Sequence, residues 1–220
     1  MLYNFIEDIK KNNIRINGVL HVGAHDGGEL DTYISNNIEN VIFVEANPNI
    51  YERLSERCKK HSNINIHTFN VGISDKKNSN VPFYVTNNDS ASSSILKLKE
   101  HMFEYPNINV INTIQIQTTT IDSLLKENNL SNEKYNVLNM DIQGAELLAL
   151  LGAQSYLEKC DAVYLEINFR EMYKDCGLNT DIEKVLHHFK FKLAKVVDTG
   201  RGWGDALYLK ETKDLNNVHI

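Results

Sequence analysis

The chain has 220 residues, and its 42% hydrophobic and 24% charged residues are typical of one globular domain with a sizeable core. A net charge of −6 gives no reason to expect a nucleic-acid partner, and no apolar run approaches the roughly 20 residues that span a bilayer. The N-terminus lacks the basic region of a signal peptide, and three cysteines without a CxxC pair indicate free thiols. We therefore expect a cytoplasmic protein.

Apolar runs of strand length alternate with helical patterns, which favours an α/β fold with a parallel sheet covered on both faces. The first part predicts helices at 2–12, 29–36 and 48–60 and strands at 19–23, 41–45 and 64–70. The later part predicts strands at 135–140 and 162–167, helices at 145–151 and 180–189, and an antiparallel hairpin of 191–197 with 206–210. We expect residues 1–220 to form a single domain.

The pattern breaks between residues 72 and 120. Two extended pieces, 81–85 and 108–118, flank the polar loop 87–94. Such excursions often carry substrate contacts, although a mobile surface loop would have the same composition. We expect this segment to leave the main sheet on the substrate side.

A glycine-rich turn follows the first predicted strand. Gly23, Gly27 and Gly28 allow the backbone to turn sharply and to approach a ligand closely. Glu45 ends the second predicted strand, about 20 residues past the first glycine, where an acid can accept hydrogen bonds from both hydroxyls of a ribose. These residues predict a nucleoside site. The spacing is not GxGxxG, which argues against a nicotinamide cofactor.

Four segments together resemble the FkbM family of S-adenosylmethionine-dependent methyltransferases. They are the glycine turn, the strand end at Glu45, residues 70–75 (NVGISD) and residues 139–146 (NMDIQGAE). The resemblance covers most of residues 18–210, and the DxxGAE element is its most specific part. It implies a three-layer, Rossmann-like class I methyltransferase fold, whose seven-stranded sheet is mostly parallel with a reversed last strand. It also implies S-adenosylmethionine as cofactor and a hydroxyl of a small molecule or glycan as acceptor.

The resemblance also implies a set of cofactor-binding residues. They are Gly23, Ala24 and His25 at the methionine moiety, Glu45 and Ala46 at the ribose, Asn70 and Val71 at the adenine, and Asp141 near the methyl group. Two positions depart from the family pattern. His21 stands where many methyltransferases have an acid for the ammonium group, and Glu29 could supply that charge. Gln143 replaces the usual acid between Asp141 and Gly144.

A hydroxyl acceptor requires a group that removes its proton. Asp141 is the first candidate base and His25 the second. Glu166 stands inside the apolar run 163–167, where a carboxylate is rarely buried without a partner, so we expect it to belong to the site.

Substrate contacts are expected at Ser93 and Ser94, as part of a lid, and at Glu146, which also suits the first turn of a helix. A divalent metal on Asp141, Glu146 and Glu166 could instead lower the pKa of the acceptor hydroxyl. No fixed metal-ligand spacing supports this, so the sequence predicts no metal.

Two other functions stay open. A nucleotide-dependent oxidoreductase would share the sheet but should carry a GxGxxG turn. A non-catalytic subunit that binds S-adenosylmethionine could keep the glycine turn, although the intact acids at 141, 146 and 166 argue against it. The sequence does not identify the acceptor or the oligomeric state.

Overall fold

The computed structural model describes residues 3–130 and 134–211. The first residue of the helix predicted at 2–12, and residues 212–220 of the predicted domain, lie outside the described residues. No helix in these two ranges has the length and apolar character that crossing a membrane requires.

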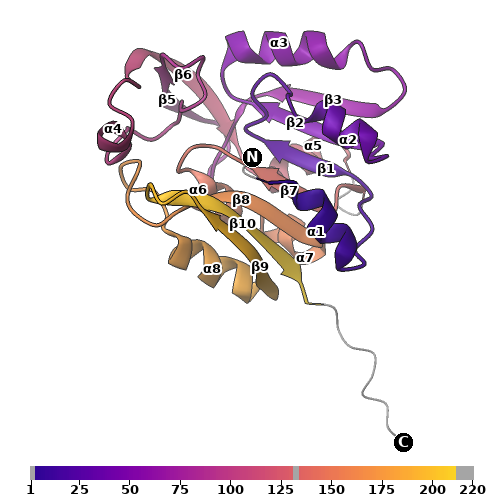
Figure 1. Cartoon of the computed structure of the whole chain (residues 1–220). Helices are drawn as coiled ribbons and strands as arrows, with labels where there is room; N and C mark the ends of the chain where they lie inside the picture. Colours follow the sequence, from indigo (N-terminus) through magenta and orange to yellow (C-terminus); the bar gives the residue numbers. More distant parts are fainter. Residues whose placement is uncertain (1–2, 131–133, 212–220) are drawn as a thin grey trace, which may run out of the picture.

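The main sheet has seven strands in the order β3-β2-β1-β7-β8-β10-β9 (Figure 1). These are β1 (Val19–Val22), β2 (Asn40–Glu45), β3 (Asn65–Asn70), β7 (Val137–Met140), β8 (Ala162–Asn168), β9 (Phe191–Asp198) and β10 (Trp203–Lys210). β10 runs antiparallel to both its neighbours, β8 and β9. All neighbouring strands from β3 to β8 in this order pair in parallel. The predicted mostly parallel sheet with a reversed last strand is confirmed, and β10 is inserted beside β8 rather than at the edge.

Helices cover both faces of this sheet. One face carries α1 (Phe5–Lys11), α2 (Leu30–Ser35) and α3 (Pro48–Cys58), and the other carries α5 (Ile121–Glu127), α6 (Glu146–Leu151), α7 (Gln154–Lys159) and α8 (Asn179–His188). Successive side chains of a strand point to opposite faces of the sheet, so the core has two parts. In β1, for example, Val19 packs on the first face and Leu20 on the second. The result is the predicted three-layer fold.

The sequence did not predict α5 or α7. Ile121, Leu124 and Leu125 have helical spacing and are buried, and Thr120 caps the helix by accepting a hydrogen bond from the backbone N–H of Ser123 (3.0 Å). The preceding extended stretch hid this short helix, because its polar residues continue up to the cap.

The segment predicted to leave the main sheet contributes three strands, which form a second sheet. Its strands are β4 (Gly72–Ile73), β5 (Ser79–Thr86) and β6 (Val110–Thr119), in the order β4-β6-β5, with α4 (His101–Glu104) in the connection between β5 and β6. Figure 1 shows β5 and β6 beside the main sheet, apart from its strands.

The strand order places the site. β1 lies between β2 and β7, so the chain leaves β1 on one side and returns on the other. Val22 is in register with Val44 and Met140, and the residues that follow these three positions are therefore neighbours at one edge. In open α/β sheets such a switch point is where ligands bind.

Candidate active site

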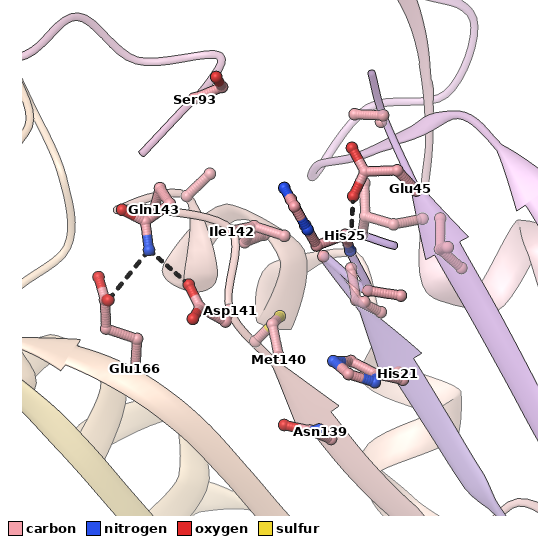
Figure 2. A pocket seen from close by; sticks show the side chains of 18 of the residues that line it. His21, His25, Glu45, Ser93, Asn139, Met140, Asp141, Ile142, Gln143 and Glu166 are labelled. Carbon is pink, nitrogen blue, oxygen red and sulfur yellow. Dashed lines mark hydrogen bonds between the residues drawn. The ribbon is translucent and has the colours of Figure 1, made fainter. Parts of the chain in front are cut away.

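A pocket opens at this switch point, at the carboxyl ends of β1, β2 and β7 (Figure 2). The predicted site residues that line it are Gly23, Ala24, His25, Glu29, Glu45, Ala46, Val71, Ser93, Asp141 and Glu166. Three other predicted residues, Asn70, Ser94 and Glu146, do not line it. Residues as far apart in the sequence as Gly23 and Glu166 are thus brought into one cavity by the sheet.

The glycine turn passes against the end of β7. Gly23 has a φ of +80°, and a Cβ at this position would lie 1.7 Å from the carbonyl oxygen of Asp141. Only glycine meets both requirements. The backbone N–H groups of Gly23 and Ala24 both donate to the carbonyl oxygen of Val44, at 2.9 and 3.0 Å, so the turn is fixed to β2 as well.

Glu45 is 8% exposed, and backbone groups orient its carboxylate. Oε2 accepts a hydrogen bond from the N–H of His25 (2.9 Å) and Oε1 accepts one from the N–H of Asn47 (2.8 Å). Burial raises the pKa of Glu45, and these two donors oppose that effect. Each oxygen retains a further lone pair, so the carboxylate can also accept from a pair of ligand hydroxyls.

Asn70 and Ser94 form hydrogen bonds with backbone segments next to the pocket. The Asn70 amide donates to the backbone oxygens of Glu45 (2.8 Å) and Ala46 (3.2 Å), which fixes the end of β2. Ser94 is buried, and its Oγ accepts from the N–H of Leu96 (3.0 Å). Their positions indicate that they shape the pocket rather than face its interior.

The polar loop 87–94 is tied to the glycine turn. His25 has a φ of +49°, and its Nε2 lies 2.7 Å from the carbonyl oxygen of Asp89. Arg53 holds the Asp89 carboxylate with two contacts of 2.8 Å. When Nε2 donates to this carbonyl, only Nδ1 of His25 can accept a proton, and Nδ1 lies 3.7 Å from Asp26 Oδ1. His25 is therefore placed better for holding the loop than for acting as a base.

His21 lines the pocket where an acid would be expected. Its Nδ1 is hydrogen-bonded to the Tyr33 hydroxyl (3.2 Å), which accepts from the Asn139 amide (2.8 Å). Burial lowers the pKa of His21, and the charge of Glu29 opposes that effect. Glu29 lines the same pocket, so it can supply the negative charge that His21 does not.

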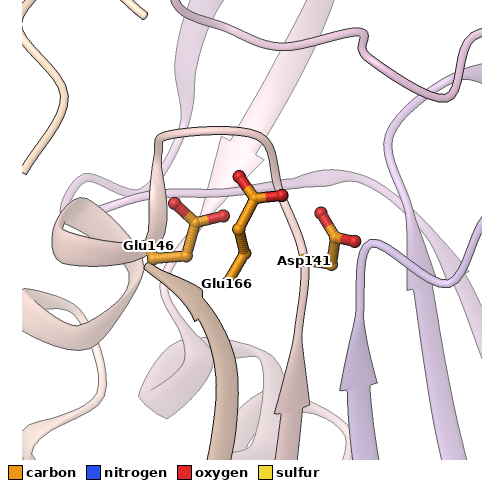
Figure 3. Close-up of side chains that lie close together, drawn as sticks. All are labelled: Asp141, Glu146 and Glu166. Atoms are coloured by element: carbon orange, nitrogen blue, oxygen red, sulfur yellow. The ribbon is translucent and has the colours of Figure 1, made fainter. Parts of the chain in front are cut away.

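Three carboxylates converge beside the pocket (Figure 3). Asp141 follows β7, Glu146 begins α6 and Glu166 lies on β8, and one oxygen of each lies within 4.8 Å of the others. The Gln143 amide donates to Asp141 Oδ1 (2.6 Å) and to Glu166 Oε2 (3.1 Å). Glu146 Oε1 accepts from the N–H of Ile142 (2.8 Å). The cluster is thus formed by the motif at 139–146 together with β8.

Burial is the main cause that raises the pKa of each of these carboxyls. The charge of Asp141 adds to the effect on the other two, and the pKa of Glu146 rises to about 8. At neutral pH the cluster therefore favours binding of protons or of another positive charge.

This shift predicts a dependence of stability on pH. The folded state holds a proton on Glu146 from its ordinary pKa of 4.5 up to about 8, whereas the unfolded chain releases it, so this stabilisation is lost as the pH rises through that window. Relative to a Glu146→Gln variant, the free energy of unfolding of the wild type should fall by on the order of 1 kcal/mol per pH unit between about pH 5 and about pH 8. Urea unfolding at several pH values measures this, and parallel curves for both proteins would contradict it.

A second pocket adjoins the first and shares Ala91, Asp141, Gln143 and Glu166 with it. Its other lining residues are Asn88, Ser92, His101, Tyr105, Ile108, Asn168, Met172, Tyr173 and Trp203. Within residues 3–130 and 134–211, His101 Nδ1 and both amide atoms of Asn168 have no hydrogen-bond partner although they are buried. The shared carboxylates therefore lie between two cavities.

Some of these residues could have been found from the sequence. Asn168 stands two positions after Glu166 on one strand, so both side chains point to the same face of the sheet. Trp203 stands between Gly202 and Gly204 at the start of β10, and it lines the second pocket. His101 lies in the irregular segment between β5 and β6, where no sequence period indicates its direction.

Comparisons with known proteins agree with this geometry. The model of the methyltransferase FkbM domain matches residues 21–193. The 2-O-methyltransferase NoeI of Sinorhizobium fredii (strain NBRC 101917 / NGR234) is 27% identical over 165 residues, which cover 71% of this chain and 65% of NoeI. The chain thus spans slightly less than two thirds of the length of that relative.

Two solved structures show the same fold. The methyltransferase FkbM from Methylobacillus flagellatus KT has a TM-score of 0.53 at 16% identity, over 91% of this chain and 46% of that one. Magnesium protoporphyrin IX methyltransferase (ChlM) from Synechocystis PCC 6803, solved with bound SAM, has a TM-score of 0.50 at 8% identity, over 92% of this chain and 74% of that one. At these identities the likeness concerns the fold alone.

Proposed function

The chain belongs to the family of methyltransferases that share the FkbM domain, and we propose that it transfers a methyl group from S-adenosylmethionine to a hydroxyl oxygen of a small molecule or glycan. The observation that carries this proposal is the Glu45 carboxylate, which two backbone donors orient in the same pocket as the glycine turn and Asp141. The match to a 2-O-methyltransferase supports an oxygen as the acceptor atom.

The residues of the pocket fit an adenosyl group with a charged amino acid end. Glu45 has free lone pairs for the two ribose hydroxyls, and the apolar side chains of Val71, Phe83 and Ile142 can pack against a flat base. Glu29 can balance an ammonium group. This combination supports S-adenosylmethionine over a nicotinamide cofactor, whose fingerprint the glycine turn lacks.

When bound, S-adenosylmethionine supplies a methyl group on a positively charged sulfur, which departs as a neutral thioether when the carbon–sulfur electron pair returns to it. The chain must hold the acceptor oxygen in line with that carbon and sulfur. It must also take the hydroxyl proton as the new oxygen–carbon bond forms.

We propose Asp141 as the group that takes this proton. It lies at the boundary of the two pockets, and a raised carboxyl pKa brings a base closer to neutral pH, where proton transfer is most efficient. Glu166 is the second candidate because it faces the same boundary. His25 is third, since its Nε2 is engaged with Asp89.

The second pocket is our proposed acceptor site. Tyr105 and Trp203 give it aromatic walls, and Trp203 Nε1 donates to the Tyr105 hydroxyl (2.8 Å). The unsatisfied polar atoms of His101 and Asn168 call for a partner with hydroxyl or similar groups. Such an acceptor places its oxygen next to the shared carboxylates. Ser93 lines the first pocket at a distance from them (Figure 2), and its Oγ accepts from the N–H of Thr86 (2.9 Å).

A cytoplasmic location remains our proposal. It is supported by Cys58, Cys160 and Cys176, which are all free and buried thiols. The net charge of −6 likewise supports an acceptor other than a nucleic acid.

Calorimetry tests the proposed cofactor. The wild type should bind S-adenosylmethionine and not NADH. Glu45→Ala should weaken binding by about 10²–10⁴-fold, because hydrogen bonds to a charged group contribute about 1.5–3 kcal/mol each and two are lost. Glu45→Gln, which keeps one acceptor oxygen, should lose less.

Each other outcome favours a different function. Binding of NADH but not of S-adenosylmethionine would indicate an oxidoreductase. Tight binding of S-adenosylmethionine without methylation of any acceptor in a panel of glycans and hydroxylated metabolites would indicate a non-catalytic subunit.

A further inference from the structure

Among the described side chains, the three converging carboxylates have no cationic partner: Asp141, Glu146 and Glu166 form no ion pair with a described Lys, Arg or His. Figure 3 shows that the three side chains come from different elements and meet at their carboxylate ends. Like charges this close repel one another unless protons or a cation lie among them.

Asn168 provides an independent observation at the same place. It is 0% exposed, and among the described residues neither its Oδ1 nor its Nδ2 has a hydrogen-bond partner. It lines the second pocket together with Asp141 and Glu166, and it shares a strand face with Glu166. A fully buried amide without partners requires an explanation, such as an ion or ligand that it contacts.

We propose that Asp141, Glu146, Glu166 and the Asn168 amide oxygen bind one divalent cation that prefers oxygen ligands, such as Mg²⁺ or Mn²⁺. Hard cations of this kind take carboxylate and amide oxygens and complete their coordination with water. Four oxygen donors from three elements exceed the one or two carboxylates that often hold Mg²⁺.

The bridge made by Gln143 agrees with this position. Its amide nitrogen donates to Asp141 and Glu166 at once, so a donor already lies where a cation would join the two carboxylates. An amide carries only partial charge and does not compensate two carboxylates.

The cation would also explain how an acceptor hydroxyl is activated. The cluster lies between the two pockets, so an acceptor oxygen that coordinates the ion would have its pKa lowered before it attacks. This catalytic role rests on the proposed methyl transfer, whereas binding of the ion does not.

Titration of the full chain with Mn²⁺, followed by electron paramagnetic resonance without S-adenosylmethionine or acceptor, tests the site. We expect one saturable site per chain, weakened roughly tenfold or more in Glu166→Gln and in Asn168→Ala. Glu183→Gln, on the exposed face of α8, is the matched control and should bind Mn²⁺ as the wild type does. Circular dichroism of each variant confirms that it is folded.

Gln143→Glu is a variant that gains function. It adds a carboxylate to the cluster, so it should bind Mn²⁺ more tightly than the wild type and be less stable without the ion. Three results would overturn the proposal: no saturable Mn²⁺ binding by the wild type, unchanged binding by Glu166→Gln, or no tighter binding by Gln143→Glu. Protons on the carboxyls would then be what reduces their mutual repulsion. Calorimetry with S-adenosylmethionine on the metal-free protein tests the proposed function separately.

Discussion

Replacing Asp141 with asparagine should lower kcat by about 10²–10⁴-fold, the range that a positioned general base contributes. Asparagine has the same shape and can still accept the hydrogen bond from the Gln143 amide, so the local structure should persist. It cannot accept the hydroxyl proton or, if the cluster binds a cation, supply a carboxylate ligand. The measurement is methyl transfer to any acceptor that the wild type methylates, with S-adenosylmethionine saturating.

The matched measurement is the Kd for S-adenosylmethionine. Asp141→Asn should change it only a few-fold, whereas Glu45→Ala should change it strongly, because Glu45 and not Asp141 is placed to bind the ribose hydroxyls. If Asp141→Asn keeps full turnover, Asp141 is not the base, and Glu166 becomes the first candidate.

Gly23→Ala should remove most of the stability of the protein. The added Cβ would lie 1.7 Å from the carbonyl oxygen of Asp141, and alanine would have to adopt a φ of +80°. Backbone atoms on both sides must move, since the clash is with the main chain and not with a flexible side chain. We expect a loss of about 4 kcal/mol or more in the free energy of unfolding, measured in urea.

Gly28→Ala is the control within the same turn. Gly28 has an ordinary φ, and the nearest heavy atom to its added Cβ would be Asp26 Oδ1, at 3.8 Å. This change should stay within about 1 kcal/mol of the wild type. Equal stability of the two variants would show that the close approach of Gly23 to β7 does not constrain the turn.

The main sheet was predictable because its central strands are buried on both faces. Runs such as 41–45 and 162–167 are almost entirely apolar, and the glycine turn and Pro48 mark where the chain reverses. The region between β4 and β6 was harder to predict. β6 is exposed over much of its length, so it has no clear period.

The site, like the fold, was predictable where its residues lie at the ends of the main-sheet strands. Glu45 ends β2, and Gly23 and Asp141 directly follow β1 and β7; the order of parallel strands brings such positions together. Asn70 and Ser94 do not line the pocket but bind the backbone close to it, so their contacts with a ligand stay predictions. The acceptor pocket depends on pairing between distant segments, which a single sequence does not reveal.

A crystal structure with S-adenosylhomocysteine, the demethylated product, is the most direct test of where the cofactor binds. We predict that its ribose hydroxyls lie against the Glu45 carboxylate and its sulfur faces Asp141. An adenosyl group bound elsewhere on the chain, or Glu45 turned away from the ribose, would contradict the proposed function.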